Sequence, residues 1–171
     1  MTRPDLEDAF GHHVWATLQL LDVCDRLTPD QLATPVPGTY GSILDTMRHT
    51  VGADAGYLFR LTGGRVSTVV EETMDLSQLR AVMERDLGEW SALLAAGVDP
   101  DIEVVAVHDD GSRTHAPVGI RLAQALHHGT DHRSQICTGL TALGIEPPEI
   151  DVWAYGATDG RVVEEDPPGG S

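Results

Sequence analysis

Apolar residues recur at intervals of three and four over four long stretches of the chain, which is the pattern of helices that bury one face. Helix-ending residues separate these stretches: Pro29 follows the first, Gly63 the second and Gly144 the fourth. Ser42 and Ser77 precede the second and third stretches as candidate N-caps. The pattern therefore predicts four long helices, over residues 6–27, 42–61, 78–94 and 118–143.

The segments between the helices differ in kind. Residues 34–41 contain two prolines and two glycines, so they are expected to form a loop. Asp110-Gly111 stands between two short apolar runs, which predicts a β-hairpin between the third and fourth helices. Five residues of the third helix are expected to face the core of the bundle: Leu79, Val82, Met83, Leu87 and Trp90.

The chain beyond Gly144 is too rich in proline to be predicted as helical. We expect it to be ordered by packing Ile150, Trp153 and Tyr155 onto the helices. Residues 159–171 are acidic and end in Pro-Pro-Gly-Gly-Ser, which is typical of a disordered tail. The fold class predicted is all-α: a four-helix bundle over residues 1–158 with a short β-hairpin between helices 3 and 4.

The net charge of the chain excludes some classes of binding partner. The 171 residues include 11 basic and 27 acidic side chains, a net charge of −16. Such a chain repels phosphate backbones and anionic lipid, so we expect no nucleic acid and no membrane as partner. Residues 1–10 lack the apolar core of a signal peptide, which favours a soluble, cytoplasmic protein. Two cysteines, Cys24 and Cys137, are too few for a disulfide framework and are expected to be reduced.

The candidate chemistry lies in the histidines of the fourth predicted helix. His128 and His132 are four residues apart, so their side chains project from one helix face about 40° and one turn apart. One helix can supply two nitrogens to a single metal ion in this way. The spacing also suits a surface pair without metal, and spacing alone does not decide between the two.

His49 lies in the second predicted helix, nearly opposite its strongest apolar stripe. Its neighbours on that face are all small: Ser42, Thr46, Ala53 and Gly56. Such a face can let a second helix approach closely, or it can leave room for a binding site. It can also simply be exposed to solvent, and periodicity does not decide among these. Asp54 is about 140° round the helix from His49, so we expect it to satisfy a buried hydrogen bond rather than to share an ion. Surface roles are expected for four further histidines: His12, His13, His108 and His115.

Three stretches of the chain carry a resemblance to a known family. They are HHVWATLQLLD (12–22), GSILDTMRHTVGADAGYLFRLTG (41–63) and LHHGTDHRSQICTGLTALGIEPPEIDVWAY (126–155). In order and spacing the chain resembles the DinB-like family, which is related to the metal-binding domain of mycothiol-dependent maleylpyruvate isomerase. The resemblance implies a four-helix bundle with a crossover connection, often found as a homodimer. It places His49, His128 and His132 at the metal-ligand positions. Asp131 stands where many members have another histidine, but it is expected to point away from the site.

Three histidine ligands leave a divalent ion with open positions, as in catalytic sites. Such an ion lowers the pKa of bound water towards about 7 or holds a thiol as thiolate. Imidazole suits zinc, nickel, cobalt and iron(II), with zinc the default. Trp15 and Tyr57 are candidates to line the binding cavity. Cys137 should face away from the ion, so a thiol would have to arrive as a small molecule.

The resemblance implies a thiol S-transferase or isomerase that uses mycothiol or a similar low-molecular-weight thiol, with a small-molecule substrate. A metal-dependent hydrolase of a small electrophile is the alternative enzyme class. A non-catalytic protein that binds metal or a small molecule, with a role in stress, is the alternative outside enzymology.

Overall fold

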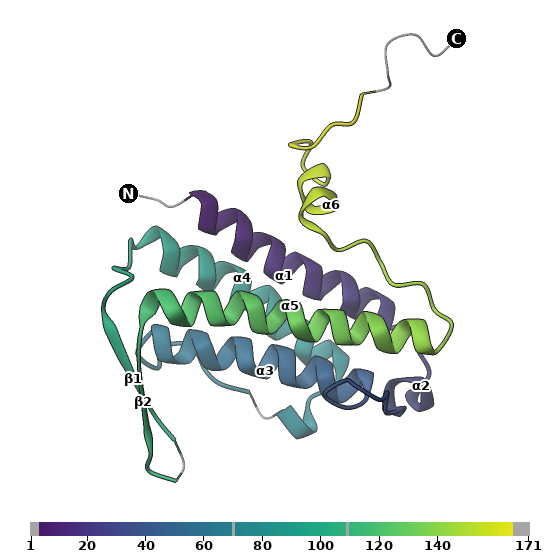
Figure 1. Ribbon diagram of the computed structural model, residues 1–171, viewed down its shortest axis with the longest axis horizontal. Coiled ribbons are helices and arrows are strands. Elements are labelled where there is room, and N and C mark those ends of the chain that lie inside the picture. The colour runs from purple at the N-terminus through teal and green to yellow at the C-terminus, as the bar shows by residue number, and fades with distance from the viewer. Residues whose placement is uncertain (1–3, 70, 109, 166–171) are drawn as a thin grey trace.

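The computed structural model describes residues 4–69, 71–108 and 110–165. Four long helices dominate this part of the chain and form a bundle, as predicted (Figure 1). They are α1 (Pro4–Cys24), α3 (Ile43–Leu61), α4 (Leu76–Ala95) and α5 (Val118–Ala142). None of the described helices is long and apolar enough to cross a bilayer.

The bundle has a crossed connectivity. α3 packs mainly against α5, and α1 mainly against α4, while α1 and α5 and likewise α3 and α4 are also neighbours. The first two long helices of the chain, α1 and α3, are therefore not principal packing partners of each other. The segment between α3 and α4 runs back along the bundle before α4 begins, so that both helices point the same way (Figure 1). This return segment contains a 3₁₀ turn, η1 (Glu71–Thr73), that packs on α3.

The helix starts follow from capping chemistry. Ser42 caps α3 as predicted: its hydroxyl accepts a hydrogen bond from the backbone N–H of Asp45, whose side chain bonds back to the cap. The prediction of Ser77 as the cap of α4 is wrong. Asp75 is the cap and exchanges the same pair of hydrogen bonds with Gln78, so that Ser77 lies inside the first turn. The carboxylate of Asp75 already accepts a free backbone N–H of the first turn, so the helix begins two residues before Ser77.

Two short helices were not predicted. α2 (Pro29–Ala33) begins after Thr28, which forms a capping box with Gln31, so Pro29 occupies the first turn of a helix. α6 (Val152–Ala157) begins after Asp151, whose side chain accepts the N–H of Ala154. The expectation of a non-helical segment is wrong at α6, since the Pro-Pro pair precedes the helix and does not interrupt it.

The C-terminal segment packs onto the bundle only in part. Ile150 is partly buried against the core and the half-buried Tyr155 contacts α1, but Trp153 is 73% exposed, contrary to expectation. Leu87, expected on the inner face of α4, is also exposed, whereas its four companions are buried. Of the predicted tail, residues 159–165 are described and include Arg161, which pairs with Asp159 and Asp8. Residues 166–171 lie outside the described part.

The predicted hairpin is present as β1 (Glu103–Val107) paired antiparallel with β2 (Arg113–Pro117). It projects from one end of the bundle (Figure 1). Arg121 at the start of α5 fastens the hairpin to the bundle by donating through Nη2 to the carbonyls of Val104 (2.8 Å) and Thr114 (3.0 Å).

Candidate metal centre

Three histidines converge between α3 and α5. His49 comes from α3, and His128 and His132 come from successive turns of α5. One nitrogen from each ring lies within 4.8 Å of the other two, and the Nε2 atoms of His49 and His128 are 3.2 Å apart. Nitrogens that ligate one tetrahedral ion at about 2.0–2.1 Å lie about 3.3 Å from each other. The donor set and its spacing therefore fit a divalent transition metal with little adjustment.

The small-residue face of α3 explains why the histidines can meet. Gly52, Ala53 and Gly56 line a cavity of about 650 Å³ beside His49. Tyr57 and His128 also line it, and their ring centroids lie 6.0 Å apart. Of the three possibilities that the sequence left open for this face, plain exposure is wrong. Ser42 and Thr46 are buried and α3 packs closely on α5, while Ala53 and Gly56 line the cavity.

Acceptors behind two of the rings fix their orientation. Nδ1 of His49 donates to Glu71 Oε2 at 3.3 Å, and Nδ1 of His132 donates to Gln135 Oε1 at 3.2 Å. With the Nδ1 proton held by an oxygen, Nε2 carries the lone pair and faces the site. Sequence reasoning missed Glu71, because the return segment that carries it has no helical or strand periodicity. The same amide oxygen of Gln135 also accepts the backbone N–H of Tyr40 at 2.7 Å.

Tyr40 covers the site from the loop before α3. Its ring stacks on His49 with a centroid separation of 4.1 Å and an interplanar angle of 7°, and its edge meets His132. Tyr40 remains 54% exposed. It therefore shields one side of the histidine cluster from water, while the cavity adjoins the other.

The electrostatics keep the imidazoles of His128 and His132 in the form that binds metal. Burial, followed by the nearby His132 and His49, lowers the pKa of His128 to about 4. Burial and His49 likewise lower the pKa of His132. Both rings are neutral at pH 7, and a neutral imidazole is the ligand form.

Trp15 lies apart from the cluster. Its ring packs against His12 and Tyr155 on the side of the bundle where α6 meets α1, and it is not among the residues that line the 650 Å³ cavity. Tyr57, the other residue expected to bind the reacting molecule, does line that cavity. Asp131 is exposed, as expected from its place on α5.

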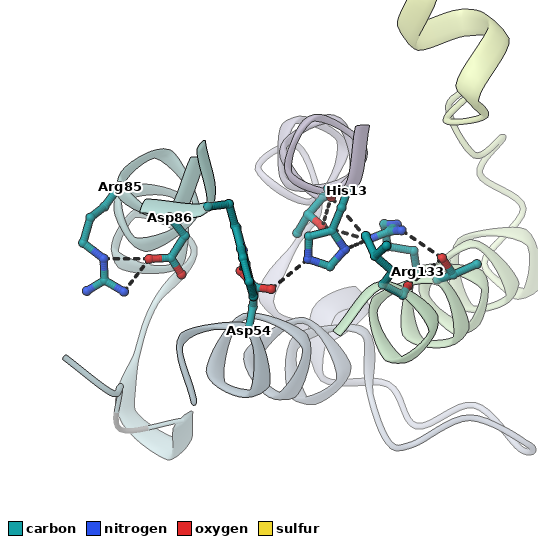
Figure 2. Close-up of polar contacts among 9 residues, drawn as sticks. His13, Asp54, Arg85, Asp86 and Arg133 are labelled. Carbon is teal, nitrogen blue, oxygen red and sulfur yellow. Dashed lines mark hydrogen bonds and ion pairs between the residues drawn. The ribbon is translucent and has the colours of Figure 1, made fainter. Parts of the chain in front are cut away.

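His13 departs from the surface role expected of it. It is 1% exposed and joins α1 to α3 and α5 in the buried network of Figure 2. Nε2 of His13 donates to Asp54 Oδ1 at 2.8 Å, and Nδ1 accepts from Arg133 Nη1 at 3.1 Å. The indole of Trp90 donates to the second oxygen of Asp54 at 3.0 Å. Asp54 thus satisfies buried hydrogen bonds, as expected, and burial lowers the pKa of Arg133 to about 10.

The other three histidines assigned to the surface differ among themselves. His12 bonds to the carbonyl of Ile150 at 2.8 Å and is half-buried, which fastens the C-terminal segment to α1. His108 and His115 are exposed on the hairpin, where His115 pairs with Glu103. His108 nevertheless contributes to the lining of the cavity beside the cluster.

The fold and the site together define a helical-bundle protein with a three-histidine candidate site for a transition metal. The chain belongs to the DinB family, whose model matches residues 1–165. No curated protein matches the chain in sequence.

Among solved structures, YfiT from Bacillus subtilis has a similar fold, with a TM-score of 0.59 and 16% sequence identity. The similarity covers 85% of this chain and 91% of YfiT. YfiT is described as a probable metal-dependent hydrolase with an unusual four-helix bundle topology. At this identity the likeness establishes the shared bundle.

Proposed function

We propose that the protein is a metal-dependent enzyme of thiol S-transferase or isomerase type, which acts on a small molecule with the help of a low-molecular-weight thiol. The observation that carries the proposal is the convergence of His49, His128 and His132 beside a cavity. When bound, an ion with three imidazole ligands offers open coordination positions and lowers the pKa of a thiol or water placed there. Zinc is the default ion, and nickel, cobalt and iron(II) suit the same ligands.

Other residues of the chain orient the histidine ligands, shield them from water and line the cavity. Glu71 and Gln135 hold the rings of His49 and His132 so that Nε2 faces the site. Tyr40 excludes water from one side of the cluster by stacking on His49. The cavity, which Tyr57 lines on the other side, has the volume typical of small-molecule sites.

The protein's own thiols are poorly suited to nucleophilic attack. Burial raises the pKa of Cys24 to about 12 and also raises the pKa of Cys137. The thiolate is the reactive form of cysteine, and it is disfavoured at both positions near pH 7. An external thiol therefore fits the site better than an internal one.

Hydrolysis is the second candidate, and one specific observation favours it: the structurally similar YfiT is described as a probable metal-dependent hydrolase. The same open positions would admit water in place of a thiol. A protein that binds metal without turnover is the third reading. A homodimer and a cytoplasmic location stay predictions.

Metal content is the first test. Elemental mass spectrometry of the untagged protein is expected to find about one equivalent of a transition metal. His49→Ala and His132→Ala should lose it while circular dichroism shows that they remain helical. His127→Ala is the matched control, because His127 is exposed beside His128 on the same helix. Parent protein that holds no metal and takes up none of the four candidate ions would refute the proposal.

Thiol dependence separates the two enzyme classes. The metal-loaded protein is assayed with 1-chloro-2,4-dinitrobenzene and N-acetylcysteine, and separately with 4-nitrophenyl acetate and no thiol. Turnover that requires the thiol and is lost in His132→Ala supports the transferase. Thiol-independent ester cleavage lost in the same variant supports the hydrolase, and binding without either activity supports the third reading.

A further inference from the structure

Two arginines share the cavity with the histidine cluster. Arg60 near the end of α3 and Arg121 at the start of α5 both line it, together with His49 and His128. Arg121 lies seven residues before His128, and Arg60 lies eleven residues after His49. At about 100° per residue, seven and eleven residues each correspond to a whole number of turns within about 20°. Each arginine therefore lies on the face of its helix that carries a candidate ligand, about 10 Å and 16 Å further along the axis.

Neither arginine has an acidic partner among the described residues, although the chain carries a net charge of −16. Arg60 bonds through Nη1 to the carbonyl of Gly56 at 2.7 Å. Arg121 bonds through Nη2 to two hairpin carbonyls. Glu71 is the one carboxylate among the described residues that line the cavity, and it is engaged with His49.

Arg121 also carries an unused donor. The residue is 7% exposed, and its Nε atom is buried without a hydrogen-bond partner among the described residues. A buried guanidinium donor without an acceptor is unfavourable, so the fold leaves part of the hydrogen-bonding capacity of Arg121 unsatisfied. Burial and then the neighbouring charge of Arg60 lower the pKa of Arg121, so the two cations are close enough to repel each other. An anion between them would offset this repulsion.

We propose that Arg60 and Arg121 form a subsite for a carboxylate on the molecule that reacts at the histidine cluster. The inference rests on the proposed function and deepens it: the substrate or the thiol is a small organic acid, with its carboxylate held towards the hairpin end of the cavity. The positions of the arginines along α3 and α5 require several bonds between the carboxylate and the reacting atom. Thr68 and Thr114 also line the cavity and supply neutral polar groups, and Thr114 belongs to the hairpin itself.

The test compares 6-mercaptohexanoate with its uncharged analogue 6-mercaptohexanamide. Both are titrated into the cobalt(II)-substituted protein, where a thiolate-to-cobalt absorption band reports the sulfur at the metal. The acid is expected to bind at least about tenfold more tightly than the amide, the gain typical of charge-assisted hydrogen bonds. In Arg121→Met and Arg60→Met this preference should fall to about twofold or less, with the Kd of the amide nearly unchanged.

Arg60→Met keeps the bonds of Arg121 to the hairpin, so it tests the subsite even where Arg121→Met loosens the fold. Arg26→Met is the control, since Arg26 is exposed in the turn after α1 and does not line the cavity. It should keep the parent's preference. Saturation-transfer NMR with both probes on the metal-free protein reports the subsite without any metal. Signal from the acid alone, lost in Arg60→Met, is the expected result.

The outcomes separate the two ideas. A cobalt band with equal affinity for acid and amide overturns the subsite and leaves thiol binding intact. No band with either probe counts against the thiol-dependent function, while the NMR on metal-free protein still decides the subsite. Equal saturation transfer from acid and amide, or from neither, rejects the carboxylate site.

Discussion

Glu71 and His49 are 22 residues apart in sequence and joined through Nδ1 of the imidazole, 3.3 Å from the carboxylate oxygen. The contact exists because the segment between α3 and α4 returns along α3 and brings η1 beside the middle of that helix (Figure 1). Gly52 permits it, since a Cβ at this position would collide with the side chain of Glu71. The crossed connectivity of the bundle thus supplies the carboxylate behind one candidate ligand.

Replacing Glu71 by alanine should weaken metal binding. The loss of the oxygen behind a ligating histidine lowers metal affinity by about 10–100-fold, because the ring loses its orientation and basicity. Competition with a chromophoric chelator measures the zinc affinity. Glu72→Ala is the control, because Glu72 is exposed on the same turn. An unchanged affinity in Glu71→Ala would show that the contact does not support the ligand.

Gly52→Ala tests the same relationship without removing the carboxylate. The added methyl group must displace Glu71, so zinc affinity should fall in the same direction as in Glu71→Ala. Combining the two substitutions should add little to either, because both remove one interaction. The chelator assay on the double variant checks this, and simple additivity of the two losses would argue against a shared cause.

His13→Ala should destabilise the fold strongly. The substitution leaves Asp54 and Arg133 buried without the imidazole that links them (Figure 2). Breaking a buried charge network from one side costs about 3–5 kcal/mol. Urea unfolding of the metal-free protein measures the free energy of unfolding. His127→Ala, an exposed histidine on α5, should change it by no more than about 0.5 kcal/mol. Equal effects of the two substitutions would refute the structural role.

Periodicity predicted the four long helices because each buries one continuous face, as Leu79, Val82, Met83 and Trp90 do on α4. The short helices α2 and α6 were not predicted because they are too short to show a repeating apolar pattern. Their starts are set by single N-caps, Thr28 and Asp151. The hairpin was predicted because Asp110-Gly111 is a local turn signal.

The candidate ligands were found by spacing within α5 and by the family resemblance at His49, but the residues around them were not. Tyr40 and Glu71 reach the site from a loop and from the turn η1, whose positions depend on tertiary packing. Arg60 and Arg121 do share helix faces with His49 and His128, so this spacing could have been read from the sequence. His13 was misjudged because its surroundings on α1 do not show that Asp54 and Arg133 come from two other helices.

Gly129→Ala should destabilise the protein although it raises helix propensity. A Cβ at Gly129 would overlap the ring of His13 and press on the guanidinium of Arg133. Gly88→Ala is the matched control on α4, because nothing lies within 4 Å of its added methyl group. The control should gain about 0.5–1 kcal/mol from propensity alone. Gly129→Ala should instead lose about 1–3 kcal/mol. Urea unfolding measures both, and a gain at Gly129 would mean that the close approach of His13 is dispensable.

The titration of Asp86 should make the free energy of unfolding depend on pH. This side chain is fully buried on α4, with Arg85 bonded to Oδ1 (Figure 2) and no partner for Oδ2 in the described part of the chain. Burial first, and then the charge of Asp54, raises the pKa of Asp86 to about 7, against the hydrogen bond from Arg85 that lowers it. In the unfolded chain the pKa of an aspartate is near 3.9.

Between these two pKa values the folded state holds a proton on Asp86 that the unfolded state has released. The free energy of unfolding contributed by this group therefore falls as pH rises from about 4 to about 7, and is level above that. Asp86→Asn removes the titration, so its stability relative to the parent should improve from pH 5 to pH 8. The gain is at most a few kcal/mol, since one pH unit corresponds to about 1.4 kcal/mol. Urea unfolding at both pH values, with exposed Asp101→Asn as control, measures it. Parallel pH profiles for the parent and Asp86→Asn would show that the carboxyl titrates alike in the folded and unfolded states.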